Sequence, residues 1–295
     1  MNANRAKPSL FDYLDYRAYL RAAFEAKKQK DTAFSYRVLA REAGFASAGS
    51  LKLAIDGRRG LSEEKARDLA AALGLKGDES DYFCFLAAFG TAKTDEARNR
   101  ALGRMRAIRR FRDVKKVELA RYEYFRHWHH LAIREMVNLE DFREDAEWIA
   151  RRLLFTLTPR DVTRTIVKLE KLGFLVRDAD GRLKQAEPVA HTEVEIEAEF
   201  ASLIAKNFHR EMMQRAAEAL EKVPAAKRDV RALTVAISRG QAERIKQMNI
   251  QHMKDVLDVV LEDEPVEAVY QLNLQWFPLT AAEPAEAGDA APGKE

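Results

Sequence analysis

The stretch YRVLAREAGFAS, residues 36–47, predicts a helix-turn-helix and decides how the surrounding sequence is interpreted. Two helices that meet at such a turn need a small residue where they touch, and Ala40 supplies it. Gly44, four positions later, suits the turn because glycine adopts a left-handed backbone without a steric penalty. Leu51 and Ile55 then supply the apolar anchors of the second helix. We therefore expect two short helices that cross at Gly44.

Further short helices are expected on both sides of this motif. Apolar residues at three- and four-residue spacing predict a helix from Leu10 to about Lys28 and another from Tyr82 to Phe89. Serine caps and terminal glycines predict the other boundaries: Ser47 and Gly57, Ser62 and Gly74, and Gly90 after the last helix. Together these signals predict a compact α-helical domain over residues 1–92.

The second helix of the motif carries few side chains that read bases. Only Ser50 and Lys52 among its early positions form hydrogen bonds, and neither makes the bidentate contact of arginine with guanine. Ser47 stands at the start of this helix, and Lys52, Arg58 and Arg59 are candidates for phosphate contacts. We expect these residues to contact double-stranded DNA, with specificity from DNA shape. A helix-turn-helix used for protein packing is the alternative.

Composition and charge limit the class of protein. The 295 residues make roughly two domains, and 47 % hydrophobic with 33 % charged residues excludes a wholly disordered chain and a collagen. The net charge of +3 divides into +10 over residues 1–126 (27 Lys+Arg against 17 Asp+Glu) and −7 over residues 127–295 (23 against 30). A basic half suggests a polyanionic partner. With one cysteine, Cys84, and no apolar run of membrane-spanning length, we expect a cytoplasmic protein without a membrane partner.

The basic side chains are densest between residues 98 and 116. They are Arg98, Arg100, Arg104, Arg106, Arg109, Arg110, Arg112, Lys115 and Lys116, and we call them the basic strip. Asp113 is the only acidic residue among them, and Thr94 is placed to cap a helix that carries them. Phosphate contact is the functional interpretation, with Arg104 and Arg109 as candidate DNA contacts. A solvated helix surface is the alternative.

A second periodic segment, Val117 to Val137, mixes histidines with aromatic residues and predicts one helix, and residues 93–137 as a whole are expected to be connecting helices. His127 and His130 share a helical face with Glu123 one turn earlier, so a metal site is geometrically possible. Their spacing matches neither His-Glu-x-x-His nor Glu-x-x-His, and an aromatic core seam with half-buried imidazoles is the favoured interpretation. Since catalytic motifs and Gly-rich phosphate loops are also lacking, we expect no catalytic residue, no metal and no cofactor.

Residues 138–190 are expected to form a winged-helix-like unit. Apolar periodicity predicts a helix from Phe142 to Leu154, and Thr158 caps a second helix that stops at Gly173. A hairpin that turns at residues 180–181 follows.

This unit offers a second possible DNA face. Arg160, Arg164 and Lys168 lie four residues apart on the second helix, and Arg182 lies on the presumed wing. Acidic residues crowd the helix before it, so dimerisation or packing is an equal alternative.

Residues 191–280 are expected to form a small C-terminal α/β unit for dimerisation or signal sensing. Its expected elements are a helix at 193–223, a strand at 231–238, a helix at 241–261 and a strand at 266–277. The Ala/Pro/Glu-rich residues 281–295 are expected to be a disordered tail.

The order of these motifs resembles an expanded family of paralogous, largely uncharacterised bacterial proteins with an N-terminal lambda-repressor-like helix-turn-helix and a C-terminal domain of unknown function. The residues that carry the resemblance, over about residues 9–280, are Phe11–Arg17, Ser50–Lys52, Asp56–Arg59, Tyr122–Glu135, Leu169–Leu175, Arg228-Asp229, Leu233–Ser238 and Val269–Thr280. The resemblance implies a transcriptional regulator and brings no ligand, operator or catalytic residue.

We therefore expect a mainly α protein with an N-terminal helix-turn-helix domain, a central winged-helix-like unit and a small C-terminal α/β unit. The expected function is a DNA-binding transcriptional regulator, with a homodimer because lambda-repressor-type domains read paired half-sites. Two hypotheses compete with it: a non-enzymatic protein-interaction scaffold, and, less favoured, a metalloenzyme on the His127–His130 cluster. No feature of the sequence identifies an effector.

Overall fold

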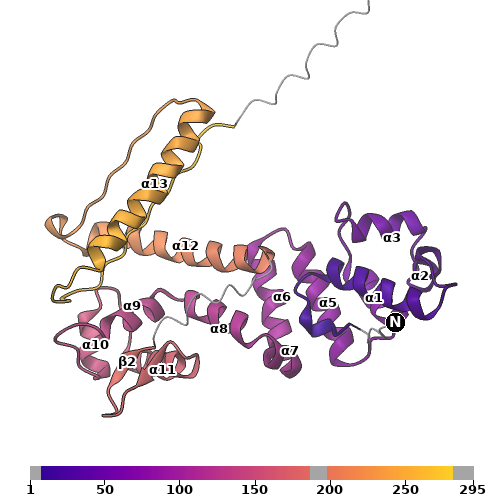
Figure 1. The fold of residues 1–295 in the computed structure, drawn as a ribbon, viewed down its shortest axis with the longest axis horizontal. Coiled ribbons are helices and arrows are strands. Elements are labelled where there is room, and N and C mark those ends of the chain that lie inside the picture. Colours follow the sequence, from indigo (N-terminus) through magenta and orange to yellow (C-terminus); the bar gives the residue numbers. More distant parts are fainter. Residues whose placement is uncertain (1–7, 187–197, 282–295) are drawn as a thin grey trace, which may run out of the picture. The chain divides into compact units, whose positions relative to one another are not determined.

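The computed structural model describes residues 8–186 and 198–281, and it is mainly helical, as the sequence predicts (Figure 1). The chain folds into two compact units. Among the described residues, the first holds residues 8–138, 142–186 and 198–214, and the second holds residues 139–141 and 215–281. In the described residues the only sheet is a two-stranded hairpin.

Two of the N-terminal helices begin at the serine caps that the sequence predicts. The predicted helix starts at Leu10 and Tyr82 are wrong: Asp15 caps the first helix, which begins at Tyr16, and the last one begins earlier, at Asp78. After a 3-10 turn (Leu10–Asp12) the helices are α1 (Tyr16–Lys30), α2 (Tyr36–Glu42), α3 (Ala48–Ile55), α4 (Glu63–Ala72) and α5 (Asp78–Thr91). The side chains of Ser47 and Ser62 each accept a hydrogen bond from a first-turn N–H of their helix. The apolar faces of these N-terminal helices form one core, in which Tyr16, Tyr82 and Phe83 are fully buried.

The turn between α2 and α3 has the predicted geometry. Gly44 has φ of 62°, and the Phe45 N–H donates to the Ala40 carbonyl at 2.7 Å, which closes the end of α2. Ala40 is 2 % exposed, and Leu51 and Ile55 of α3 are buried beside it. Ala40 and the two apolar side chains of α3 are therefore buried, and Gly44 has the left-handed backbone that the turn requires.

The connecting region contains more helices than the sequence predicts. They are α6 (Asp95–Ala107), α7 (Arg109–Val114), α8 (Lys116–Phe125) and α9 (Trp128–Met136). The prediction of one helix from Val117 to Val137 is wrong, because the chain is extended at His127. His130 Nδ1 donates to the carbonyls of Glu123 (2.7 Å) and Tyr124 (3.2 Å), so a side chain replaces the backbone donors that a continuous helix would supply.

The next elements are α10 (Ala146–Arg152), α11 (Pro159–Lys171) and the antiparallel strands β1 (Leu175–Arg177) and β2 (Leu183–Gln185). In the hairpin Leu175 pairs with Gln185 and Arg177 pairs with Leu183. Helix α10 starts later than predicted, because Asp145 caps it by accepting from the Trp148 N–H at 2.6 Å. Thr158 caps α11 as predicted.

Helix α12 (Ala198–Lys222) packs its first half on the helices of the first unit. The buried ring of Phe200 lies 6.4 Å from Phe89 and 6.1 Å from Tyr122, measured between centroids. Asn207 and Asn99 exchange side-chain hydrogen bonds of 3.0 and 3.3 Å. The predicted start of this helix, residues 193–197, lies outside the described residues.

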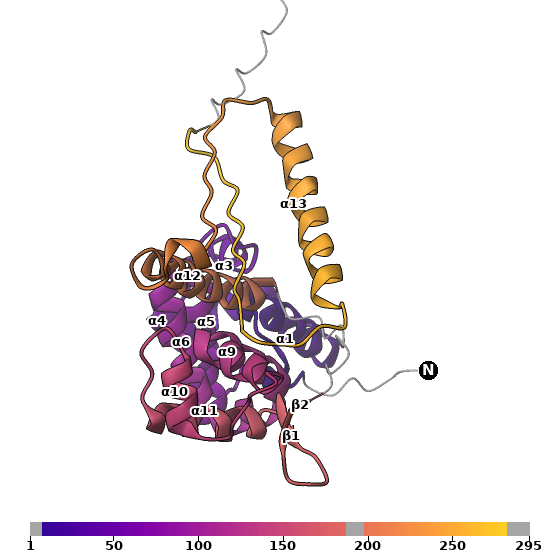
Figure 2. The ribbon, with the colours of Figure 1, turned by 90° about the vertical axis from the view of Figure 1, so that its left-hand side faces the viewer.

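The second unit is built around α13 (Arg239–Val260), after a 3-10 turn at Ala225–Lys227. Two extended segments, residues 228–238 and 264–281, run in the same direction, opposite to that of α13 (Figure 2). The predicted strands at 231–238 and 266–277 lie in these segments, and neither is a β-strand, because within the described residues no β-ladder joins them. Of the predicted tail, residues 282–295 lie outside the described residues.

Gly90 lies inside α5 and not after its end as predicted, and it offers a test of the core. An ideal Cβ at Gly90 would lie 2.9 Å from Cδ1 of Tyr16, whose ring is fully buried. We predict that Gly90→Ala destabilises the protein by about 1–3 kcal/mol through overpacking.

The matched control is Gly103→Ala in α6, where a Cβ has no neighbour within 4 Å. It should stabilise the protein by about 0.5–1 kcal/mol, because alanine is the better helix former. Urea unfolding of both variants measures the difference, and equal effects would contradict the packing of Gly90 on Tyr16.

Candidate functional site

The first candidate site is the exposed surface of α2 and α3. The Ser47 hydroxyl accepts from the Ser50 N–H at 3.1 Å, while the Ser47 N–H donates to Ser50 Oγ at 3.2 Å. The Ser50 hydroxyl in turn donates to the Ser47 carbonyl at 2.7 Å. Both hydroxyls are therefore engaged in the cap of α3, and Lys52 is the exposed hydrogen-bonding side chain one turn further on.

Basic side chains are exposed on α3, on the turn after it and on α2. Lys52, Arg58 and Arg59 are all exposed, and the Arg59 N–H donates to the Leu53 carbonyl at 3.1 Å, which holds the chain against the end of the helix. Arg37 and Arg41 are exposed on α2. Sequence reasoning missed these two arginines, although their four-residue spacing on a polar face is a signal for them.

Contacts from other helices hold α2 and α3 in place. Lys65 of α4 donates to the Gly44 carbonyl at 2.9 Å and pairs with Asp68 at 2.9 Å. Phe24 of α1 stacks on Tyr36 at the start of α2, with 3.8 Å between ring centroids and 7° between planes. The surface is therefore fixed on a rigid support, which a recognition surface requires.

Part of the basic strip serves the fold. Arg106 pairs with Glu123 at 2.6 Å, Lys115 pairs with Glu118 at 3.1 Å, and Arg112 donates to the carbonyl oxygens of Arg106 (2.7 Å) and Ala107 (2.9 Å) at the end of α6. Arg106 and Lys115 are therefore neutralised by carboxylates, while Arg112 caps a helix and remains exposed.

The two members of the strip that the sequence proposes for DNA lie away from α3. Arg104 lies 5.7 Å from the centroid of the Phe85 ring, and Arg109 pairs loosely with Asp113 at 3.7 Å. Helices α5 and α1 lie between their helices, α6 and α7, and α3 (Figure 1). The structure therefore does not bring Arg104 and Arg109 together with Lys52.

Glu123 is the one buried acidic side chain among the described residues. Its carboxylate is 8 % exposed and pairs with Arg106 of α6, with Arg126 at 3.4 Å and, very closely, with Lys168 of α11. Burial raises the pKa of Glu123, but the hydrogen bond from Lys168 and the charges of the two arginines outweigh it, so the pKa lies below its ordinary value. This carboxylate therefore stays ionised and joins three helices.

The histidines beside it are neutral. Burial lowers the pKa of His127 to about 4 and that of His129 to about 3, and it also lowers the pKa of His130. His129 Nδ1 donates to the Thr165 hydroxyl at 3.0 Å, which donates on to a carbonyl of α11. Within the described residues no group of three or more His, Cys, Asp or Glu side chains is placed to hold a metal ion. The geometry fits the core-seam interpretation of these imidazoles.

The second possible DNA face is only partly available. Lys168 is engaged by Glu123, and Arg164 pairs with Asp161 at 3.5 Å. Arg160 and Arg182 are exposed. On the hairpin, Arg177 is bound by Glu144 at 2.6 Å and by Glu170 at 2.8 Å. Acidic neighbours therefore neutralise much of the charge that this face carries in the sequence.

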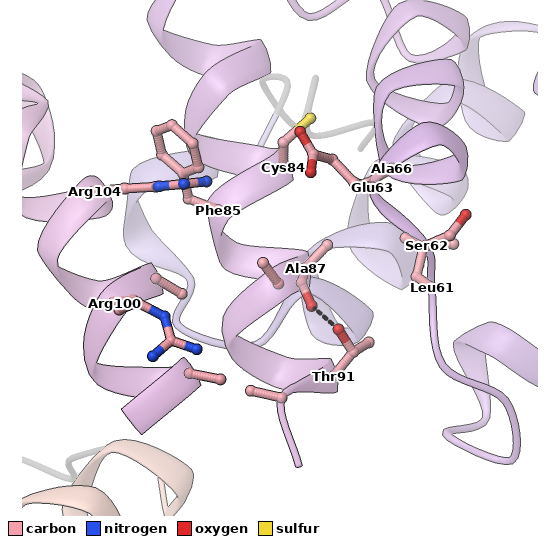
Figure 3. Close-up of a pocket in the computed structure, with 14 residues that line it drawn as sticks. Leu61, Ser62, Glu63, Ala66, Cys84, Phe85, Ala87, Thr91, Arg100 and Arg104 are labelled. Carbon is pink, nitrogen blue, oxygen red and sulfur yellow. Dashed lines mark hydrogen bonds between the residues drawn. The ribbon is translucent and has the colours of Figure 1, made fainter. Parts of the chain in front are cut away.

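A cavity of about 260 Å³ lies between α4, α5 and α6 (Figure 3). Small side chains such as Ala66 and Ala87 line it, and the guanidinium groups of Arg100 and Arg104 lie on one side. Cys84 also lines it, and burial raises the pKa of its thiol, which keeps it protonated and unreactive. Glu63 lines the cavity as well, so its lining carries charges of both signs.

A comparison with known protein families finds a match for the second part of the chain. A family described as a domain of unknown function, DUF4423, matches residues 108–279. The chain belongs to the DUF4423 family. The matched range begins at the break between α6 and α7 and contains Glu123, α11 and α13, so the α2–α3 surface lies before it. No curated protein and no solved structure matches the chain.

In the described residues, no helix is both long and apolar enough to cross a membrane.

Loss of the Glu123 charge tests the structural role of this cluster. We predict that Glu123→Gln, which keeps the shape of the side chain, lowers the free energy of unfolding by about 2 kcal/mol, because Arg106 and Lys168 lose their buried counter-charge.

The matched control is Glu147→Gln, whose partner Arg151 lies 3.5 Å away on an exposed surface, and it should change stability by less than about 0.5 kcal/mol. Urea unfolding at neutral pH measures both variants. A Glu123→Gln protein as stable as the control variant would contradict the role given to the cluster.

Proposed function

We propose that the chain is a DNA-binding transcriptional regulator, in which α2 and α3 act as a helix-turn-helix on double-stranded DNA. The observation that carries the proposal is the tight α2–α3 turn at Gly44, with Ala40 at the helix contact and exposed cations on α2 and α3. In such motifs the second helix enters the major groove while the first crosses the backbone. Arg37 and Arg41 then belong to the backbone-contacting helix.

The proposed contacts are mainly to phosphates. Lys52, Arg58 and Arg59 are the cations that α3 and the following turn present to solvent. Since the Ser47 and Ser50 hydroxyls are engaged in the cap, side chains that read bases are scarce. Specificity on this proposal comes from half-site spacing and from DNA shape.

The DUF4423 region has a supporting role in this proposal. Residues 108–279 would dimerise the regulator or receive a signal, without a catalytic function and in the cytoplasm. The neutral histidines and the engaged cations around Glu123 support a structural role for this region's centre. The rival function is a scaffold whose α2–α3 surface binds protein, and the exposed Leu53 on α3 (41 %) favours it.

The salt dependence of duplex binding tests the proposal. The probe is a fluorescent mixed-sequence DNA duplex, and anisotropy is measured between 25 and 200 mM salt. We predict that Lys52→Ala/Arg58→Ala/Arg59→Ala reduces the slope of log K against log [salt] by about 2–3, because each lost phosphate contact removes about 0.9.

The matched control removes the same number of charges from the other face, as Arg160→Ala/Arg164→Ala/Arg182→Ala. It should leave the slope within about 0.5 of the unmodified protein. A slope that falls only in the control triple would place the DNA contact on α11 and the hairpin. Undetectable duplex binding at the lowest salt would favour the scaffold.

A further inference from the structure

The second unit carries a helix without a buried side chain. Helix α13 runs for 22 residues, and none of them is buried. A helix on the surface of a globular protein normally buries an apolar stripe against its core. Ala242, Ile245 and Val256 are half-buried along the side nearest the extended segments, while Met248, Leu257 and Val260 remain 67, 56 and 70 % exposed. The apolar side chains of α13 therefore span more than half of its circumference, and only the part that holds Ala242, Ile245 and Val256 is half-buried.

The exposed apolar surface continues beyond α13. Nineteen large hydrophobic side chains between Val230 and Leu279 are 38–82 % exposed, among them Tyr270, Trp276 and Phe277. A soluble monomer rarely exposes this many large apolar side chains within one compact unit. A stable interface takes about 20–30 residues from each partner, so this surface is large enough for one.

The charges on α13 are arranged against the preference of a single helix. Its first half carries Arg239, Arg244 and Lys246 against one acidic residue, and its second half carries Asp255 and Asp258 against one lysine, followed by residues 262–264, which are all acidic. The helix dipole favours acidic residues at the N-terminus and basic residues at the C-terminus, which is the opposite arrangement. An antiparallel neighbour of the same sequence would supply the missing compensation at both ends.

The register of two charged residues fits such a neighbour. Arg244 and Asp255 each lie five residues from an end of α13, so they are placed symmetrically about its centre. They are also eleven residues apart, about three turns, and therefore lie on the same side of the helix. Met248 and Val259 lie along that side and are 67 and 64 % exposed. In an antiparallel pair related by a two-fold axis at the helix centre, Arg244 of each copy faces Asp255 of the other.

We propose that the second unit is a dimerisation surface, in which α13 packs antiparallel on α13 of a second copy of this chain. The two Arg244–Asp255 pairs flank a contact between the Met248 side chains near the helix centre and fix its direction, and the extended segments 228–238 and 264–281 widen it on the same unit. The interface does not depend on the proposed DNA contact, so the two proposals fail or hold separately.

Charge reversal in the full chain, without DNA, tests this surface. Sedimentation equilibrium of the unmodified protein over a dilution series should give a dimer. We predict that Arg244→Glu and Asp255→Arg each raise the dimer Kd about tenfold, because each places like charges together twice per dimer. The double variant should return to within about threefold of the unmodified Kd, and an equimolar mixture of the single variants should form a heterodimer tighter than either alone.

Lys254→Glu is the matched control, since it lies about 100° around the helix from Asp255 and should change the Kd less than threefold. Circular dichroism confirms that each variant keeps its helix content. A protein that stays monomeric at 100 μM, as it would if the second unit were covered by another part of the same chain, overturns the proposal. So does a dimer whose Kd the single variants leave unchanged or the double variant fails to restore.

Discussion

The buried carboxylate of Glu123 is the interaction on which the arrangement of the first unit depends. It stands in α8 and collects Arg106 from α6 and Lys168 from α11, with Arg126 at its edge. A buried charge is tolerated only when it is paired, so these three helices are held to one geometry. The cluster also crosses the start of the DUF4423 match, since Arg106 precedes residue 108. The ion pair between Arg106 and Glu123 thereby links α6, which precedes the family match, to α8 within it.

This interaction changes the meaning of the charge distribution. The +10 of residues 1–126 suggests a broad basic surface, but Arg106 and Lys115 of the basic strip are neutralised by carboxylates and Arg112 caps α6. The cations of α2, α3 and the turn after α3 are exposed, which concentrates the proposed DNA contact on one small surface. A count of charges along a sequence therefore overestimates the surface that phosphates reach.

The sequence predicts those features that depend on neighbouring residues. The caps at Ser47, Ser62 and Thr158 and the turn at Gly44 are local, and the structure has them. The break at His127 could not be predicted, because it depends on how the His130 ring reaches the end of α8. The expected strands at 231–238 and 266–277 fail for a similar reason: alternation predicts an extended chain, but a strand needs a neighbour, which local pattern does not supply.

The central claim is that α3, and not the basic strip, meets the duplex. Directed cleavage tests it most directly: Lys52→Cys and Arg109→Cys, each in a Cys84→Ala background, are coupled to an iron chelate and mixed with a labelled duplex. The account predicts strand cleavage from position 52 and at most background cleavage from position 109, since α5 and α1 lie between α3 and α7. Cleavage from position 109 alone would contradict it.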